Sequence, residues 1–254
     1  MVGEGLQLTD ALVVFIVDFG LHLIEEDATL TFIFFLGVSL LGVLGLRFSY
    51  YAQKNMQQTR IEPQKQIWQY LRFIGVFGAA YALVWIIEIV SSVGFEAKNG
   101  IWLAMTLFLV FSLRQISTTA GRGLGDNQKA LDRLVRLLFV GVLGVYIVLT
   151  VIFGVGRVTA FLEALSGTAF LLYGVYFFRR QVSSTRLQGT MLDSLLRHLL
   201  PVLTFASLVS IVALAISFGV DQTVVLHLQL VFLIMTATSL MTATIKLRQN
   251  LASL

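Results

Sequence analysis

Five acidic and histidine side chains in the apolar stretches of this 254-residue chain are candidates for chemistry, because a charged group is out of place there. They are Asp18, His22, Glu88, Glu163 and His227. A carboxylate or an imidazole at membrane depth is costly unless it is paired, neutralised or in contact with water. Such groups form ion and proton relays, and they also ligate divalent metals and haem. The residue types therefore indicate either ion or proton handling, or a metal or haem centre.

Asp18 and His22 belong to the most polar of these stretches, "VDFGLHLIEED" at 17–27. Together with Glu25 they are spaced i, i+4 and i+7, so a helix places all three on one face. Glu25 and the two acids after it also fit a loop in water ahead of the next helix, where negative charge is favourable. We expect these acids to cap a loop, and Asp18 and His22 to face a polar interior.

The composition indicates where such residues must sit. Hydrophobic residues make up 57% of the chain and charged residues 13%, and the mean hydropathy is +0.86. A soluble domain has about a quarter charged residues, so this chain cannot cover itself with polar surface in water. Its apolar runs approach the roughly 20 residues that cross a bilayer as a helix. The N-terminus lacks the basic region and cleavage site of a secretory signal. We therefore expect residues 1–254 to form a single integral membrane domain.

Hydropathy divides the chain into eight apolar segments that predict an all-α, polytopic transmembrane bundle. They are 8–24, 29–48, 70–93, 101–119, 134–154, 159–178, 197–219 and 223–245. The connections alternate between short ones and long basic ones, so the helices are expected to pair as four hairpins. Segment 8–24 fits least well, because it is short and carries Asp18 and His22. If it does not span, seven crossings remain and the N-terminus lies outside.

The basic residues predict the orientation. All but two of the 18 lysines and arginines fall on the side of the long connections, and the exceptions are Lys98 and Arg157. Lysine and arginine are retained on the cytoplasmic side, so the long loops and the C-terminus are expected there. This bias explains the net charge of +4 without a nucleic-acid partner. The basic loops fit anionic lipid headgroups, or a membrane or cytoplasmic protein partner.

Internal similarity suggests parallel repeats. "GVFG" at 75–78 recurs as "GVLG" at 141–144, and "RQIST" at 114–118 recurs as "RQVSS" at 180–184. Hairpins that begin and end on the same side would be related by an axis along the membrane normal. Chance similarity between apolar helices is the alternative. The glycines in these motifs, and those in 29–48, predict faces where helices approach closely.

The predicted helix directions bring the remaining acidic and histidine residues toward the outer half of the bundle. The three positions are Glu88 near the end of 70–93, Glu163 at the start of 159–178 and His227 two turns into 223–245. Apart from Arg157 at the rim, no cation is expected nearby, so the group should be net acidic and unpaired. Simpler interpretations exist: Glu163 as an interfacial first-turn acid, and each histidine as a neutral ring bonded to a carbonyl. Asp18 and Glu88 are the strongest candidates.

Three function classes fit these expectations. The first is a transporter, channel or proton-coupled carrier, in which Asp18, Glu88 and Glu163, helped by His22 or His227, bind an ion, a proton or a small solute. The second is a metal or haem protein with His22 and His227 as ligands, joined by Asp18 and Glu88 around a metal ion. The third is a structural or sensory subunit that acts through a partner.

Enzymatic chemistry is less favoured by the sequence. It contains no H-E-x-x-H, no Walker loop and no G-x-S-x-G motif. A retinal Schiff base is also excluded, because that chemistry needs a lysine at mid-membrane depth. All five lysines are expected in loops or at helix ends.

Overall fold

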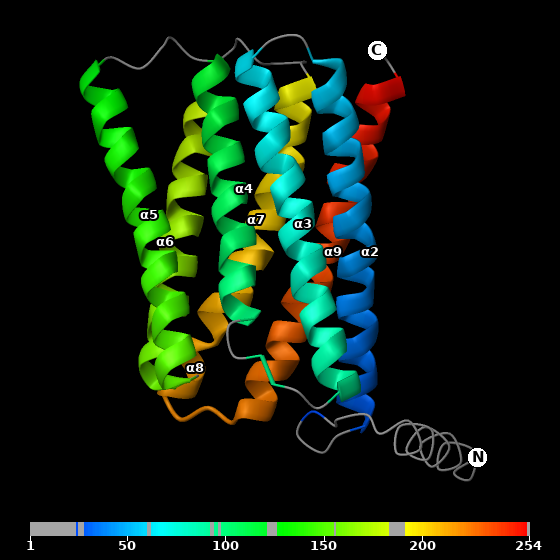
Figure 1. The fold of residues 1–254 in the computed structure, drawn as a ribbon, viewed down its shortest axis with the longest axis vertical. Helices are drawn as coiled ribbons and strands as arrows, with labels where there is room; N and C mark the ends of the chain where they lie inside the picture. The colour runs from blue at the N-terminus through cyan, green and yellow to red at the C-terminus, as the bar shows by residue number, and fades with distance from the viewer. Residues whose placement is uncertain are drawn as a thin grey trace.

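The protein is an all-α bundle in the part of the chain that the computed structural model describes, namely Ile24 and residues 28–59, 62–91, 94–95, 98–120, 126–154, 156–182 and 191–252. Its long helices are α2 (Ala28–Gln58), α3 (Glu62–Ser91), α4 (Lys98–Ala120), α5 (Asp126–Phe153), α6 (Arg157–Val182), α7 (Met191–Val212) and α9 (Gln222–Ala252). A four-residue helix, α8 (Leu214–Ser217), continues α7 after a break. Successive long helices run up and down through the bundle (Figure 1).

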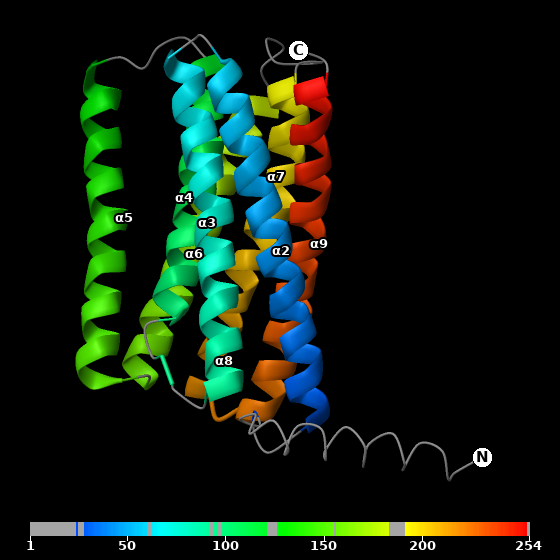
Figure 2. The ribbon, with the colours of Figure 1, turned by 45° about the vertical axis from the view of Figure 1, so that its right-hand side comes forward.

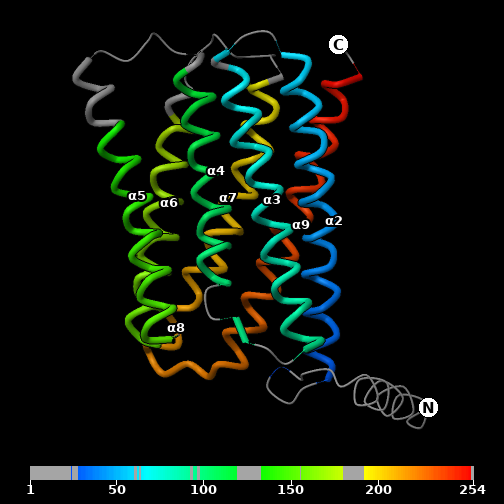
Figure 3. The backbone as a smooth tube through the Cα atoms, viewed as in Figure 1, coloured from blue at the N-terminus to red at the C-terminus, as the bar shows by residue number. Residues whose placement is uncertain are grey.

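Within the described residues, seven helices are long and apolar enough to cross a membrane. This confirms the expected class, a polytopic membrane protein built from helices. Eight spans were expected, and the first of them, 8–24, lies outside the described residues except for Ile24. The backbone trace in Figure 3 follows the seven described spans from α2 to α9.

The helices extend well beyond the apolar segments. α2 ends at Gln58 and α3 begins at Glu62, so the expected long basic loop after 29–48 is mostly helix. The expectation of a long connection here was wrong, because hydropathy detects only the part of a helix that lies in hydrocarbon. A 31-residue helix such as α2 is about 46 Å long, whereas the hydrocarbon core is about 30 Å thick.

The packing of neighbouring helices is uneven. α3 packs against both α2 and α4, α9 packs against α2 and α7, and α6 packs against α4 and α7. Of the expected hairpins, α3–α4 and α7–α9 pack closely, whereas α5 touches α6 and α4 only lightly. Figures 1 and 2 show α5 at the edge of the bundle in both views.

The closest approach between α2 and α3 occurs at two glycines. A Cβ atom on Gly45 would lie 2.8 Å from the carbonyl oxygen of Gly75, and a Cβ on Gly75 would collide with the backbone of Gly45 and Ser49. Helices in lipid associate through such close van der Waals contact. The predicted close-approach faces of α2 and α3 are therefore confirmed here.

The corresponding prediction for α5 was wrong. Gly141 and Gly144 have open space where a side chain would be, and the large apolar residues around them are exposed. These residues are suited to contact lipid tails rather than protein. Gly75 and Gly141 occupy equivalent positions in the similar sequence motifs, yet their surroundings differ.

Candidate functional site

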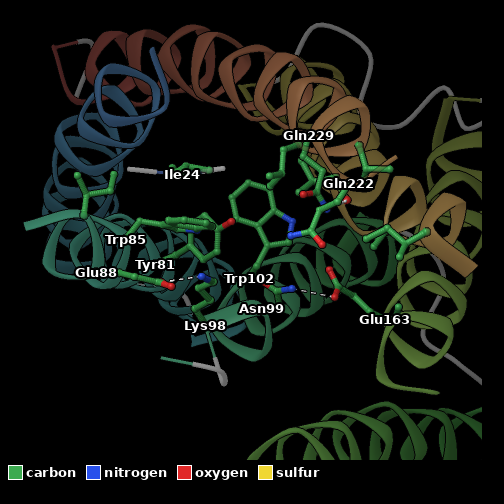
Figure 4. Close-up of a pocket in the computed structure, with 17 residues that line it drawn as sticks. Ile24, Tyr81, Trp85, Glu88, Lys98, Asn99, Trp102, Glu163, Gln222 and Gln229 are labelled. Atoms are coloured by element: carbon green, nitrogen blue, oxygen red, sulfur yellow. Dashed lines mark hydrogen bonds and ion pairs between the residues drawn. The ribbon is translucent and has the colours of Figure 1, made fainter. Parts of the chain in front are cut away.

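A cavity of about 360 Å³ lies at the end of the bundle where α3 ends and α4, α6 and α9 begin. We call this the cavity end. Its walls come from α3, α4, α6, α9 and the break between α7 and α8, with Ile24 closing one side (Figure 4). The Ile24 backbone N–H is held by the Thr31 hydroxyl, 2.8 Å away. The chain thus brings five helical segments together around one space.

Glu88 and Lys98 form an ion pair on one side of the cavity. Lys98 Nζ lies 2.6 Å from Glu88 Oε2, and both side chains are 17% exposed. The ammonium also lies 3.7 Å from the centre of the Trp85 ring, within the range of a cation–π interaction. The expectation that Glu88 is unpaired was wrong. α4 begins at Lys98, and this position directs the lysine back toward the last turns of α3.

Glu163 lies on the opposite side of the cavity and is 3% exposed. Its Oε2 accepts a hydrogen bond from Asn99 Nδ2 at 3.0 Å and one from the Tyr146 hydroxyl at 3.2 Å. Asn99 comes from α4 and Tyr146 from α5, so three helices meet at this carboxyl group. The interpretation of Glu163 as a first-turn acid at the interface was wrong, because α6 begins at Arg157 and Glu163 lies beyond its first turn, where neighbouring helices bury it.

Aromatic rings form the wall between the two carboxyl groups. Tyr81 and Trp85 of α3 and Trp102 of α4 line the cavity (Figure 4). The ring centres of Tyr81 and Trp102 are 4.7 Å apart. Trp102 Nε1 donates a hydrogen bond to the carbonyl oxygen of Ala206, 2.9 Å away on α7, which fixes the ring between α4 and α7. The sequence analysis did not select these residues, although two of the chain's three tryptophans are among them.

The break after α7 supplies another part of the wall. α7 continues through Pro201 and ends at Val212, and Ala213 separates it from α8. Near this break, the carbonyl oxygen of Val209 accepts a hydrogen bond from Gln229 Nε2 of α9 at 3.1 Å. Val209, Ala213 and Gln229 all line the cavity. The interrupted helix and a side-chain amide therefore meet at the site.

Of the residues selected from the sequence, the structure brings Glu88 and Glu163 to one cavity. His227 was expected beside them, but its side chain is exposed and its Nδ1 lies 2.7 Å from the carbonyl oxygen of Thr223. Successive helical positions are rotated by about 100°, so neighbours at 225, 226 and 229 face the cavity while 227 does not. Asp18 and His22 lie outside the described residues.

The described part of the chain supplies no cluster of ligands for the metal centre that the sequence suggested. Within those ranges, no group of three histidine, aspartate or glutamate side chains is placed to hold a metal ion. Glu88 is paired with Lys98, and His227 is turned away from the cavity. The two carboxyl groups of the cavity are therefore held by nitrogen and hydroxyl donors.

No protein-family model, curated protein or solved structure matches this chain.

Proposed function

We propose that this membrane protein handles a small solute, an ion or a proton through the cavity, with Glu163 as the receiving carboxyl group. The observation that carries the proposal is the burial of Glu163 at a cavity wall. The side chains that hold it, Asn99, Tyr146 and Ser210, are all neutral. A buried carboxyl group is costly to keep in a bundle, and a cavity beside it gives room for a partner.

The size and lining of the cavity support binding of a small molecule. Its volume of about 360 Å³ falls within the roughly 300–1,000 Å³ of small-molecule sites. Such sites combine mostly apolar walls with a few placed polar groups. Here the apolar walls are the aromatic rings and the aliphatic residues of α9, and the polar groups are Glu163, Asn99, Gln222 and Gln229.

We further propose that the cavity opens to the outer side of the membrane. The end of α9 and the helix ends that adjoin the arginine- and lysine-rich connections lie at the opposite end of the bundle (Figure 1). The positive-inside bias of the sequence favours a cytoplasmic location for that end. Asp18 and His22 stay in the proposal as further members of the site, because the chain that follows them reaches the cavity at Ile24.

Reconstituted protein provides the test. Wild-type protein, Glu163→Gln and Glu88→Gln are placed in liposomes with the pH dye pyranine inside, and proton uptake is followed after a pH step. In parallel, the melting temperature of each protein is measured with a panel of small amines, amino acids, sugars, carboxylates and monovalent salts. A ligand that binds the folded state raises the melting temperature. Glu62→Gln is the matched control, because Glu62 is 78% exposed at the other end of the bundle.

We expect the wild type and Glu62→Gln to show proton uptake or stabilisation by at least one solute. Glu163→Gln should lose the effect that the wild type shows. Glu88→Gln should weaken it, because Lys98 is left without its carboxylate. If wild-type protein shows neither effect, or if a folded Glu163→Gln variant behaves as the wild type does, the proposed function is wrong.

A further inference from the structure

We infer that the solute received at this cavity is a small organic cation, an amine or a quaternary ammonium. This inference rests on the proposed function and adds the chemical class of the ligand. It is carried by two features together: the buried Glu163 held by neutral groups, and the aromatic wall that separates it from the Glu88–Lys98 pair.

The distribution of charge favours a cation. Among the described residues that line the cavity, the charged groups are Glu88, Lys98 and Glu163. Lys98 contacts Glu88 at 2.6 Å, so this pair is neutral as a unit. The Asn99 amide and the Tyr146 phenol donate to Glu163 Oε2, and the Ser210 hydroxyl also interacts with this carboxyl group, so the groups that hold it are neutral. A positive ligand would balance the negative charge of Glu163. An anion would instead bring a second negative charge into the same buried space.

The aromatic wall favours an organic cation over an inorganic one. An ammonium group is attracted to the face of a tryptophan or tyrosine ring when it lies within about 6 Å of the ring centre. The chain already shows this arrangement, because Lys98 Nζ lies 3.7 Å from the centre of Trp85. Trp102 and Tyr81 extend the same wall toward Glu163 (Figure 4). On one side of the cavity, the Lys98 ammonium thus lies beside a carboxylate and an aromatic ring. We infer that a ligand ammonium takes the same position beside Glu163 on the other side.

The remaining lining agrees with this class. A bare metal ion is held by several oxygen or nitrogen ligands at close range. The described lining instead offers one carboxyl group that is not in an ion pair and three side-chain amides, together with rings and aliphatic side chains. Two of the amides, Asn99 and Gln229, already donate hydrogen bonds to protein acceptors. The cavity of about 360 Å³ is also far larger than an inorganic ion. A cation with an apolar body uses all of these features.

The tryptophans make the binding measurable. Trp68 lies 17 positions before Trp85 on α3, which is about 25 Å along a helix. In a Trp68→Phe background, both remaining tryptophans, Trp85 and Trp102, line the cavity. Fluorescence excited at the tryptophan edge is titrated with three probes of similar shape: 2-phenylethylammonium, the neutral 2-phenylethanol and the anion phenylacetate. The same titrations are made with Glu163→Gln and with the control Glu62→Gln.

We expect saturable quenching by 2-phenylethylammonium, at least tenfold weaker binding of the alcohol and no binding of phenylacetate. Glu163→Gln should weaken binding of the ammonium at least tenfold and leave binding of the alcohol within about twofold, and Glu62→Gln should match the parent. If the alcohol or phenylacetate binds as tightly as the ammonium, the cation class is wrong while the proposed solute site stands. If no probe binds, the inference is also overturned, and the liposome and melting experiments decide separately whether the proposed function holds.

A measurement on the unsubstituted protein keeps the inference testable if Glu163→Gln does not fold. A hydrophobic carbodiimide modifies buried carboxyl groups, and mass spectrometry locates the modified residue. We expect benzyltrimethylammonium, a quaternary ammonium that cannot react with the activated carboxyl group, to slow modification of Glu163 at least threefold. Benzenesulfonate, an anion that carries no carboxyl group to consume the reagent, should leave it unchanged at the same concentration. Equal protection by both probes, or by neither, contradicts the inference.

Discussion

Lys98 and Glu88 are ten positions apart in the sequence, and their charged atoms meet at 2.6 Å across the connection between α3 and α4. Because both side chains are mostly buried, little water is available to replace either partner. The Trp85 ring beneath the ammonium provides a third contact. The pair therefore ties the end of one span to the start of the next, at the rim of the candidate site.

Removal of one partner of this pair should destabilise the protein. Lys98→Met leaves the Glu88 carboxylate buried without a counter-ion, and we expect the free energy of unfolding to fall by about 3 kcal/mol. Denaturation of the purified protein in mixed micelles with increasing SDS measures the change. The double variant Lys98→Met/Glu88→Gln should recover at least half of the loss, because no unpaired charge remains. Equal stability of Lys98→Met and wild type would show that the pair contributes nothing.

The contact between α2 and α3 at Gly75 should not tolerate a side chain. A Cβ on Gly75 collides with the backbone of Gly45 and Ser49, so Gly75→Leu must separate the two helices. We expect a loss of about 1–3 kcal/mol or more in the same denaturation assay, with a lower yield of folded protein. Gly141→Leu is the control, because open space surrounds Gly141. A similar loss in both variants would contradict this account of the packing.

Asn55 should stabilise the opposite end of the bundle. Its Nδ2 donates to the carbonyl oxygen of Leu247 at 3.1 Å, and its Oδ1 accepts a bond from Asn250 Nδ2, so α2 is joined to α9. Asn55→Leu removes both bonds between the helices, and also the bond from Asn55 to the carbonyl oxygen of Tyr51. We expect a loss of about 1–3 kcal/mol. Thr238→Val, at an exposed position of α9, should stay within about 0.5 kcal/mol of wild type. Thermal denaturation in detergent distinguishes the two.

Asp221 should make the stability depend on pH. Its Oδ1 accepts a hydrogen bond from the Thr223 N–H at 2.7 Å just before α9 begins, and this bond lowers the pKa of Asp221 below the usual range. A lowered pKa in the folded state means that the stabilisation is complete above the unfolded-state pKa, about 4. It is then lost as the pH falls through the lower folded-state pKa.

The measurement compares melting temperatures between pH 3 and pH 7 for wild type and Asp221→Asn. Asparagine caps a helix as well as aspartate does but does not titrate in this range. We expect the two proteins to melt alike near the acidic end and the wild type to be the more stable at pH 7. Parallel curves across the range would show that Asp221 contributes no pH dependence.

Much of the fold was predictable from hydropathy alone. Seven of the expected spans are present, since a run of apolar residues has few alternatives to a membrane helix. The i, i+4 spacing of Asp193 and Arg197 also suits an ion pair on a helix, and Arg197 Nε lies 3.3 Å from Asp193 Oδ2 on α7. Helix ends were predicted poorly, because the polar turns outside the hydrocarbon carry no hydropathy signal.

The candidate site was predictable only in part. The positions of Glu88 and Glu163 along their predicted spans suggested that they belong to a site, and both line the cavity. Their partners were missed, because pairing depends on which helices are neighbours. Lys98 was assigned to a loop, and Asn99 and Tyr146 were not selected, although both donate to Glu163. His227 shows the same limitation, since its rotation about the α9 axis decides its surroundings. A helical wheel anchored on the small and aromatic residues of each span would have improved these assignments.

The peripheral position of α5 has a consequence for how its sequence can vary. Tyr146 must keep its place, because its hydroxyl reaches Glu163, and Ile147 packs against Gly100. Most other positions from Leu134 to Phe153 meet the bilayer rather than protein. For those positions the bilayer is the solvent, and it distinguishes poorly between leucine, valine, isoleucine and phenylalanine. At most positions of α5 any apolar residue should therefore serve, and only a few positions require a particular residue.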